Sequence, residues 1–269
     1  MPVQVRFSAF HTKDYRFPVI FFFIREAEMT AVFVNCAAII VGSVIGLLCA
    51  RKMTETLSDS IQTAAGIVVV IIGLQMAFKY RSIVYLALSL IGGGLVGSWL
   101  NIDGGILRFG SFLQRLVYRG RNKAEEQGDK NFAYAFLNAS VLFCVGAMAI
   151  IGSFKAAIEK DYTIIFTKSI LDGFMAITFA AAMGAGTAFS FIAVFVYQGA
   201  LTLLSYLIKP YVTDVMVAEL TGCGGALIVM IGINLLGLRK IKTANYLPAL
   251  LFEIAFVLAD PYIRNIVHF

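Results

Sequence analysis

The sequence predicts an all-α, polytopic membrane protein with seven or eight transmembrane helices, about eight by our count of the apolar runs. Of its 269 residues, 59% are hydrophobic and only 14% are charged, and its mean hydropathy is +0.84. Soluble domains carry about a quarter charged residues. Because a transmembrane helix needs about 20 apolar residues, this length leaves no room for a large soluble domain.

The first 28 residues differ from the rest of the chain. Four basic residues surround an apolar stretch, 17–24, that is too short to span a bilayer, and no signal-peptide cleavage pattern follows it. A full-length apolar span begins at Met29. We therefore expect residues 1–28 to be a dispensable extension, poorly ordered or bound at the membrane surface, and residues 29–262 to form a single transmembrane domain.

Seven further apolar runs follow this first span: 61–78, 83–100, 132–154, 164–185, 187–208, 217–238 and 244–259. Gly184 and Gly186 separate two of these runs, which predicts a turn between two spans, with one bent helix as the alternative. The run 132–154 contains Gly146 and Gly152. It is therefore expected to be a broken or re-entrant element, or else a regular crossing.

The single sizeable hydrophilic stretch, residues 101–131, is predicted to be a cytoplasmic loop that carries an amphipathic helix. Apolar side chains fall on one helical face and arginines on the other, which is typical of a helix lying on the membrane surface. The apolar set is Ile106, Phe109, Leu113, Leu116 and Val117, and the basic set is Arg108, Arg115 and Arg119. Its basic residues favour the cytoplasmic side, which would place both chain ends outside.

The chain repeats part of its own sequence. Gly66 to Gln75 (GIVVVIIGLQ) aligns with Gly225 to Asn234 (GALIVMIGIN), and YLALSL at 85–90 aligns with YLPALL at 246–251. The copies are five crossings apart, so an inverted repeat is predicted, as in many transporters; chance similarity of apolar sequences is the alternative. The expected division is repeat 1 at 29–100, central helices at 132–186 and repeat 2 at 187–262.

Lys168, Ser169 and Asp172 are the strongest candidates for a binding site. Lys168 and Asp172 are one turn apart on one helical face, and Asp172 lies 12 residues before Gly184, so it is well below the membrane surface. Charged groups inside a bilayer cost several kcal/mol unless they are paired or hydrated. The two residues therefore form either a substrate or ion site or a local ion pair that only makes the helix tolerable.

Buried amides and carboxyl groups form a second set of candidates. Asn35, Gln198 and Asn234 are predicted to be neutral ligands of the same site, because an amide in an apolar span needs a partner; hydrogen bonding between helices is the alternative for these and for Gln75. Glu253 lies deep in its span and needs a partner that the sequence does not identify. Glu219, near a span start, fits an ordinary interface carboxylate.

Several segments together resemble the bacterial YqgA/YdfK family of inner-membrane proteins of unknown function. They are VNCAAIIVGSVIG, CVGAMAIIGS, TKSILDGF, the MGAGTAFSFIAVFVYQGALTLL run, TGCGGALIVMIGINLL and NYLPALL, in order between about Met29 and Pro261. The resemblance implies a polytopic bacterial membrane protein that begins near the first Asn-containing span. It also implies that the Lys-Ser...Asp motif is Lys168, Ser169 and Asp172. The family pattern has no acid at the position of Glu253.

The expected function is a secondary transporter or channel-like permease for a small polar or ionic solute, with its site near the membrane midplane. The alternative is a non-transporting scaffold or sensor whose buried polar residues only join helices. We expect no enzyme activity, catalytic residues, metal site, cofactor or nucleic-acid partner, because the membrane runs hold no histidine and no nucleophile with its base. The expected partners are membrane lipid, the solute and, in a homo-oligomer, a second copy; the expected location is the bacterial inner membrane.

Overall fold

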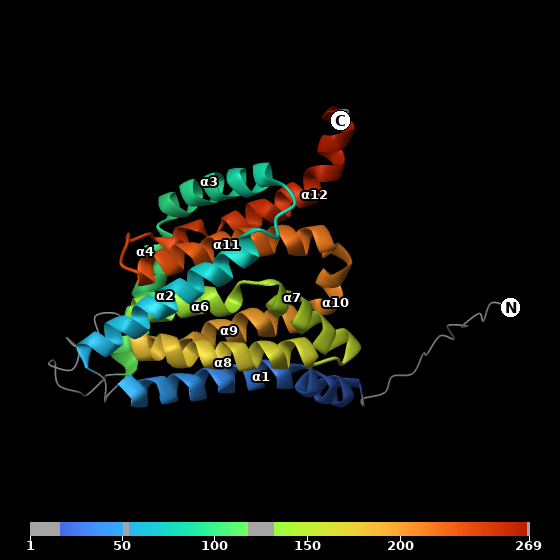
Figure 1. The fold of residues 1–269 in the computed structure, drawn as a ribbon. Coiled ribbons are helices and arrows are strands. Elements are labelled where there is room, and N and C mark those ends of the chain that lie inside the picture. Colours follow the sequence, from blue (N-terminus) through green and yellow to red (C-terminus); the bar gives the residue numbers. More distant parts are fainter. Residues whose placement is uncertain (1–16, 51–53, 118–131, 268–269) are drawn as a thin grey trace.

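The computed structural model describes residues 17–50, 54–117 and 132–267, and in these ranges the chain is helical with short connections. Seven of the helices are long and apolar enough to cross a membrane, and one bent pair of helices brings the number to eight. The prediction of a polytopic all-α membrane protein is thereby confirmed. The helices lie side by side as one elongated bundle (Figure 1).

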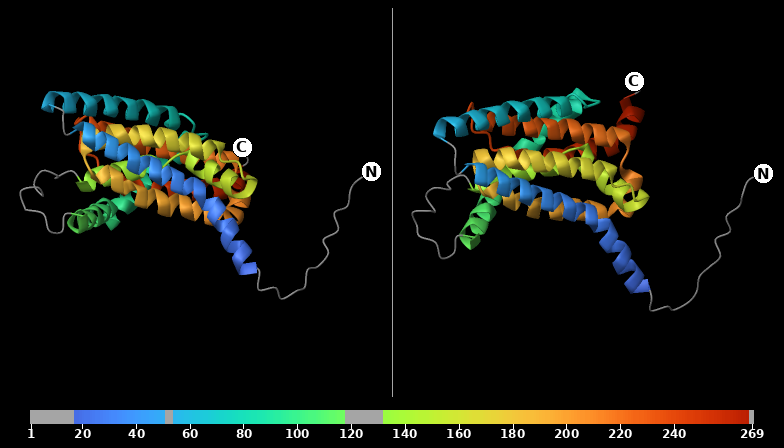
Figure 2. Two further views of the ribbon diagram at one scale, coloured as in Figure 1. Left: turned by 90° about the horizontal axis from the view of Figure 1, so that it is seen from below. Right: turned by 60° about the horizontal axis from the view of Figure 1, so that its bottom comes forward.

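The first span belongs to a longer helix than the sequence predicted. Helix α1 runs from Phe17 to Ala50, and its span-forming part is Met29–Ala50. Residues 17–28 are thus a continuation of the first helix, so this part of the segment is helical and not poorly ordered; binding at the membrane surface stays a prediction, and residues 1–16 lie outside the described residues. Figure 2 shows the beginning of α1 projecting beyond the other helices.

Helix α1 packs in parallel against α8, which spans Thr163–Met183. A Cβ atom at Gly42 would lie 2.2 Å from the carbonyl oxygen of Gly173, and one at Gly46 would lie 2.2 Å from that of Ile177. Only glycine permits so close an approach of the two backbones. Since residue numbers rise together along both helices, α1 and α8 cross the membrane in the same direction.

Helix α2, Glu55–Ala77, packs antiparallel against α11, Asp214–Leu235. A Cβ atom at Gly232 would lie 3.0 Å from the Gly66 carbonyl oxygen, and one at Gly225 would lie 2.6 Å from that of Gly73. Helix α3, Ile83–Leu100, lies in the same antiparallel way beside α12, Ala249–Val267, which follows the short 3₁₀ turn Thr243–Tyr246.

Hydroxyl side chains fix where these helices begin. The hydroxyl groups of Thr54, Ser82 and Thr213 each accept the backbone N–H three residues further on, at the starts of α2, α3 and α11. Such N-caps satisfy one of the N–H groups that a helix leaves without a partner.

The predicted amphipathic helix is α4, Ile102–Val117. Leu113 is buried against α6, Phe132–Cys144, in a cluster with Phe132 and Phe136, while Arg108 and Arg115 are exposed. Phe109 is also half exposed. The remainder of the stretch, 118–131, lies outside the described residues, so Arg119 has no structural description.

The span that the glycines marked as irregular is broken at Gly146. Helix α6 ends at Cys144 and α7 runs from Ala147 to Phe154, continued by a π-helical turn at Lys155–Glu159, and the two parts are bent by 57°. Gly146 has φ +134°, a conformation that glycine adopts without strain, whereas Gly152 lies inside α7. Helices α2 and α3 cross the bundle once each after α1. Because α8 runs parallel to α1, α6 and α7 together must make one further crossing before α8, as Figure 1 shows.

The predicted turn at Gly184 is also confirmed. Gly184 has φ +93° and ends α8, and α9 follows as Gly186–Leu203. Two spans therefore form here, and the alternative of one bent helix is wrong. The short helices Ser205–Ile208 (α10) and Lys209–Tyr211 connect α9 to α11.

Candidate functional site

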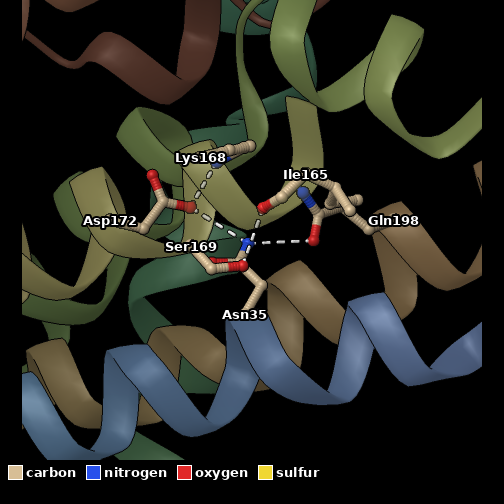
Figure 3. A network of polar contacts seen from close by, with 6 residues as sticks. All are labelled: Asn35, Ile165, Lys168, Ser169, Asp172 and Gln198. Atoms are coloured by element: carbon tan, nitrogen blue, oxygen red, sulfur yellow. Dashed lines mark hydrogen bonds and ion pairs between the residues drawn. The ribbon is translucent and has the colours of Figure 1, made fainter. Parts of the chain in front are cut away.

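Four polar side chains from three spans meet inside the bundle. Asn35 comes from α1, Lys168 and Asp172 come from α8, and Gln198 comes from α9 (Figure 3). Asn35 and Gln198 are completely buried, and Lys168 and Asp172 are only 6% and 8% exposed. The sequence had named all four as candidates, and the fold brings them together as one group, here called the Lys168 cluster.

Asp172 and Asn35 hold the Lys168 cluster together. The ammonium group of Lys168 donates to Oδ2 of Asp172, one helical turn away. The amide Nδ2 of Asn35 donates to the same Oδ2 at 3.0 Å and to Oε1 of Gln198 at 2.9 Å. A single amide therefore links α1 to both α8 and α9.

The Lys168 cluster keeps unused hydrogen-bonding capacity. Oδ1 of Asn35 and Nε2 of Gln198 are buried and have no hydrogen-bond partner. One is an acceptor and the other a donor. Buried polar groups are almost always paired, so the cluster has one donor and one acceptor whose hydrogen-bonding capacity is not used by the protein.

A cavity of about 620 Å³ reaches the ion pair. Lys168 and Asp172 both line it, together with Gln75 of α2, Lys79 just after α2, Thr221 of α11 and mainly apolar residues. Its volume is in the range of small-molecule sites, which combine apolar walls with a few polar groups. The charged pair is thus accessible from a space large enough for a small solute.

The break between α6 and α7 borders the same cavity. Val145, Gly146 and Ala147 line it, and Gly146 supplies no side chain to cap the first N–H groups of α7. The start of a helix carries a partial positive charge. Broken helices whose ends face a binding site near the midplane are a recurring feature of secondary transporters.

The other predicted ligands lie elsewhere or make local bonds. Ser169 is buried and donates to the carbonyl oxygen of Ile165 at 2.8 Å. Asn234 lies at the end of α11, where its amide group donates to the Ile241 carbonyl oxygen at 2.8 Å and accepts the Ile241 N–H at 2.6 Å. Its predicted place beside Lys168 is therefore wrong, because it closes the α11–α12 connection instead.

Sequence reasoning did not anticipate two further contributors to the cavity. Thr221 follows Glu219 in an ordinary-looking stretch, and Gln75 appeared only as one of several buried amides. The alignment of 66–75 with 225–234 predicted that α2 and α11 are copies of one another. It did not predict that both helices border one cavity. Within the described residues no three His, Cys, Asp or Glu side chains gather as a metal site would require.

Comparison with known proteins assigns the chain to a family. A profile described as "Protein of unknown function (DUF554)" matches residues 30–258. The chain is 30% identical to the uncharacterized membrane protein YdfK of Bacillus subtilis over 221 residues, which covers 81% of this chain and 90% of YdfK. It is 27% identical to the uncharacterized protein YqgA of Escherichia coli over 219 residues, 81% of this chain and 92% of YqgA. No solved structure matches the chain. The match to the greater part of the chain and the identity to YdfK confirm the resemblance noted above: this is a membrane protein of the DUF554 family.

Proposed function

We propose that this protein is a secondary transporter or channel-like permease for a small polar or ionic solute. The observation that carries the proposal is the buried Lys168–Asp172 pair at the edge of a cavity, next to a broken helix. An ion pair that only stabilised α8 would not need a cavity. Charged groups inside a membrane typically mark solute or ion pathways.

The polar groups suit a solute that carries hydrogen-bonding groups or charge. The ammonium of Lys168 attracts an anionic group and the carboxylate of Asp172 a cationic one. The free donor of Gln198 and the free acceptor of Asn35 lie in the adjoining part of the cluster. A solute that competes for either member of the ion pair would change how α1, α8 and α9 are held together.

The contacts between α2 and α11 support an inverted repeat. A Cβ atom at Gly232 would lie 2.5 Å from Cγ2 of Val70, and a Cβ atom at Gly73 would lie 2.8 Å from Cγ2 of Val229. In the sequence alignment Gly73 corresponds to Gly232, and Val70 to Val229. Each contact is therefore the exchanged copy of the other, as a two-fold axis between antiparallel copies requires. Inverted repeats of this kind are frequent in transporters that alternate between two states.

The proposal can be tested before the solute is known. Thermal melting of the purified protein would be followed with a panel of amino acids, monovalent cations and small inorganic anions, because a ligand that binds the folded state stabilises it by about 2.7 kcal/mol at 100 times its Kd. We expect one chemical class to raise the melting temperature. That compound would then be used for uptake into vesicles that contain the protein.

Asp172→Asn is the decisive variant. It should leave the protein folded, because the amide has the shape of the carboxylate and Lys168 can be hydrated from the cavity, with a stability loss below about 1 kcal/mol. It should abolish both the ligand-induced shift and uptake. Asp59→Asn, the same change at an exposed position near the start of α2, is the matched control and should alter neither. A shift that survives in Asp172→Asn would place binding elsewhere.

A non-transporting scaffold or sensor is the second candidate function. One observation favours it, namely that Asp172 is already paired with both Lys168 and Asn35. This reading predicts that Asp172→Asn destabilises the protein by about 3–5 kcal/mol, as expected when one member of a buried pair is removed. Adding Lys168→Met would then recover the loss. Melting of the single and double variants separates the two functions.

The remaining parts of the proposal concern location and partners. We place the protein in the bacterial inner membrane, since both relatives come from bacteria. Large apolar side chains are exposed along α1, α3 and α8, among them Val41, Trp99 and Phe174. Membrane lipid or a second copy of the chain would cover them. The protein is proposed to have no enzyme activity.

A further inference from the structure

A second group of buried polar residues lies on the other side of the bundle, between α3, α11 and α12. Glu219 of α11 is 1% exposed and Glu253 of α12 is completely buried. Glu253 lies near the middle of the candidate span Thr243–Asp260. Each carboxyl group is within electrostatic range of the other, and neither lines the cavity beside Lys168. We call Glu219, Glu253 and the adjacent Ser89 the Glu253 cluster.

Glu219 has a hydrogen-bond partner in the backbone of α3. The backbone N–H of Ser82, at the start of α3, donates to Oε1 of Glu219 at 2.8 Å. A carboxylate accepts such a bond more strongly than a neutral acid does. The start of a helix also favours negative charge. Only Oε2 of Glu219 remains without a partner.

Glu253 has no hydrogen-bond partner at close range; the one donor that faces it is the Ser89 hydroxyl. Neither of its oxygen atoms accepts a hydrogen bond. The neighbouring Ser89 hydroxyl of α3 faces it but is also without a partner and completely buried. Around them lie Leu86, Cys223 and Ala249, which form an apolar cluster. Glu253 is thus a carboxyl group in an environment that offers no compensation for a negative charge.

The groups that face Glu253 from the helices packed against it include no cation. From α11 they are Glu219 and Cys223, and from α3 the hydroxyl of Ser89. The hydroxyl of Tyr85 of α3 does not reach Glu253. It donates to Oδ1 of Asp260 at 2.6 Å, about two turns beyond Glu253 along α12. In the part of the chain that the structure describes, Glu253 forms no ion pair with Lys, Arg or His.

We infer that the Glu253 cluster is a proton-binding site in which Glu253 carries an exchangeable proton and Glu219 is the neighbouring carboxyl group, held by the Ser82 N–H. A lone carboxylate in an apolar interior is so costly that the group takes up a proton instead. The proton would be donated to the free oxygen of Ser89 or to Oε2 of Glu219, which are the acceptors at hand. The protonated Glu253 thereby supplies the donor that these unpartnered oxygen atoms lack.

This site is separate from the Lys168 cluster and does not depend on the proposed transport activity. It lies on α3, α11 and α12, three of the four helices whose segments align in the predicted repeat. If the protein transports a solute, a proton on Glu253 is available as the coupling ion. If it does not, the proton site still exists as a property of the folded protein.

Infrared spectroscopy of the full chain in lipid tests the inference directly. We expect a carbonyl band of a protonated carboxylic acid at neutral pH that shifts on deuterium exchange and on ¹³C labelling of glutamate side chains. The labelling distinguishes Glu253 from aspartates such as Asp172 without any substitution. Glu253→Gln should remove the band, and Glu219→Gln should retain it.

Replacing choline by sodium in the buffer separates proton binding from cation binding. If Glu253 holds a proton, the band is unchanged by sodium and disappears as the pH rises. Loss of the band in sodium at constant pH would show that the free oxygen atoms bind a metal cation, and would overturn the inference. Absence of any glutamate-labelled band in the wild-type chain, or its survival in Glu253→Gln, would overturn it as well.

Discussion

The Lys168 cluster and the Glu253 cluster handle buried charge in opposite ways. In the first, a carboxylate has an ammonium partner and an amide donor and lies at the edge of a cavity. In the second, Glu219 accepts one backbone N–H, neither oxygen of Glu253 accepts a hydrogen bond, and both lie among apolar side chains. A bilayer permits a buried acid if it is paired and hydrated, or if it is neutral, and this molecule uses both solutions.

The difference follows from the packing around each cluster. The bend at Gly146 separates α6 from α7 and leaves a cavity beside α8, so the Lys168 cluster has access to small polar molecules. The glycines of α3 instead bring α12 into backbone contact: a Cβ atom at Gly93 would lie 2.3 Å from the Ala249 backbone nitrogen. The Glu253 cluster thus lies where two helix backbones are in close contact, and neither of its glutamates lines the cavity beside Lys168.

The largest effect is expected from breaking the amide link of the Lys168 cluster. Asn35→Leu keeps the approximate side-chain volume but removes the donor for both Asp172 and Gln198. We expect a loss of about 2 kcal/mol, because two buried acceptors lose a bond and one of them is charged. Thermal melting in detergent measures it.

The matched control comes from the Glu253 cluster. Ser89 is equally buried and has no hydrogen-bond partner at close range. The bond expected from protonated Glu253 has Oε2 of Glu219 as an alternative acceptor, so Ser89→Ala should cost less than about 1 kcal/mol. Equal losses in Asn35→Leu and Ser89→Ala would contradict the contrast between a bonded and an unbonded cluster.

A smaller effect should separate the two glutamates of the Glu253 cluster. Glu219→Leu leaves the Ser82 N–H at the start of α3 without its acceptor, and we expect it to cost about 1 kcal/mol. Glu253→Leu removes a group that accepts no bond, so stability should be unchanged or should rise. Melting temperatures of the two variants, measured side by side, give the comparison. A destabilisation confined to Glu253→Leu would mean that Glu253, not Glu219, has the stronger partner.

Most of the fold could be predicted from the sequence because membrane spans are recognisable from composition. The apolar run 83–100 coincides with α3, and the breaks at Gly146 and Gly184 occur where the glycines indicated them. The start of α1 was not predicted, since residues 17–28 are too few to span and were judged by length alone. Helix formation there continues an existing helix and needs no further apolar run.

The candidate site was predicted less completely, because only proximity along one helix is visible in a sequence. Lys168 and Asp172 are one turn apart, so their pairing followed from helical periodicity. Asn35 and Gln198 are 163 residues apart, and nothing in the sequence indicated that these two amides, and not Asn234, would meet the ion pair. Asn234 aligned with Gln75 as a deep amide, but it lies at a helix end, where a connection needed its hydrogen bonds.

Two aspartates outside the spans reproduce the same contrast on a smaller scale and give the last prediction. Burial raises the pKa of Asp103 above its ordinary value of 3.8, against the opposing effects of the Ala244 N–H and Lys242. The hydroxyl and backbone N–H of Thr163 lower the pKa of Asp161 below that value, and Lys155 lowers it further. The stability that protonated Asp103 contributes is present below pH 3.8 and is lost as the pH rises through the raised pKa; that of Asp161 is present above pH 3.8 and is lost as the pH falls through the lowered pKa. Asp103→Asn should therefore raise the melting temperature at neutral pH, and Asp161→Asn should lower it slightly. In a pH series that extends below 3.8, the melting temperature of each variant should approach that of the wild-type chain. Shifts of the same sign at neutral pH would show that burial and hydrogen bonding do not separate these two carboxyl groups.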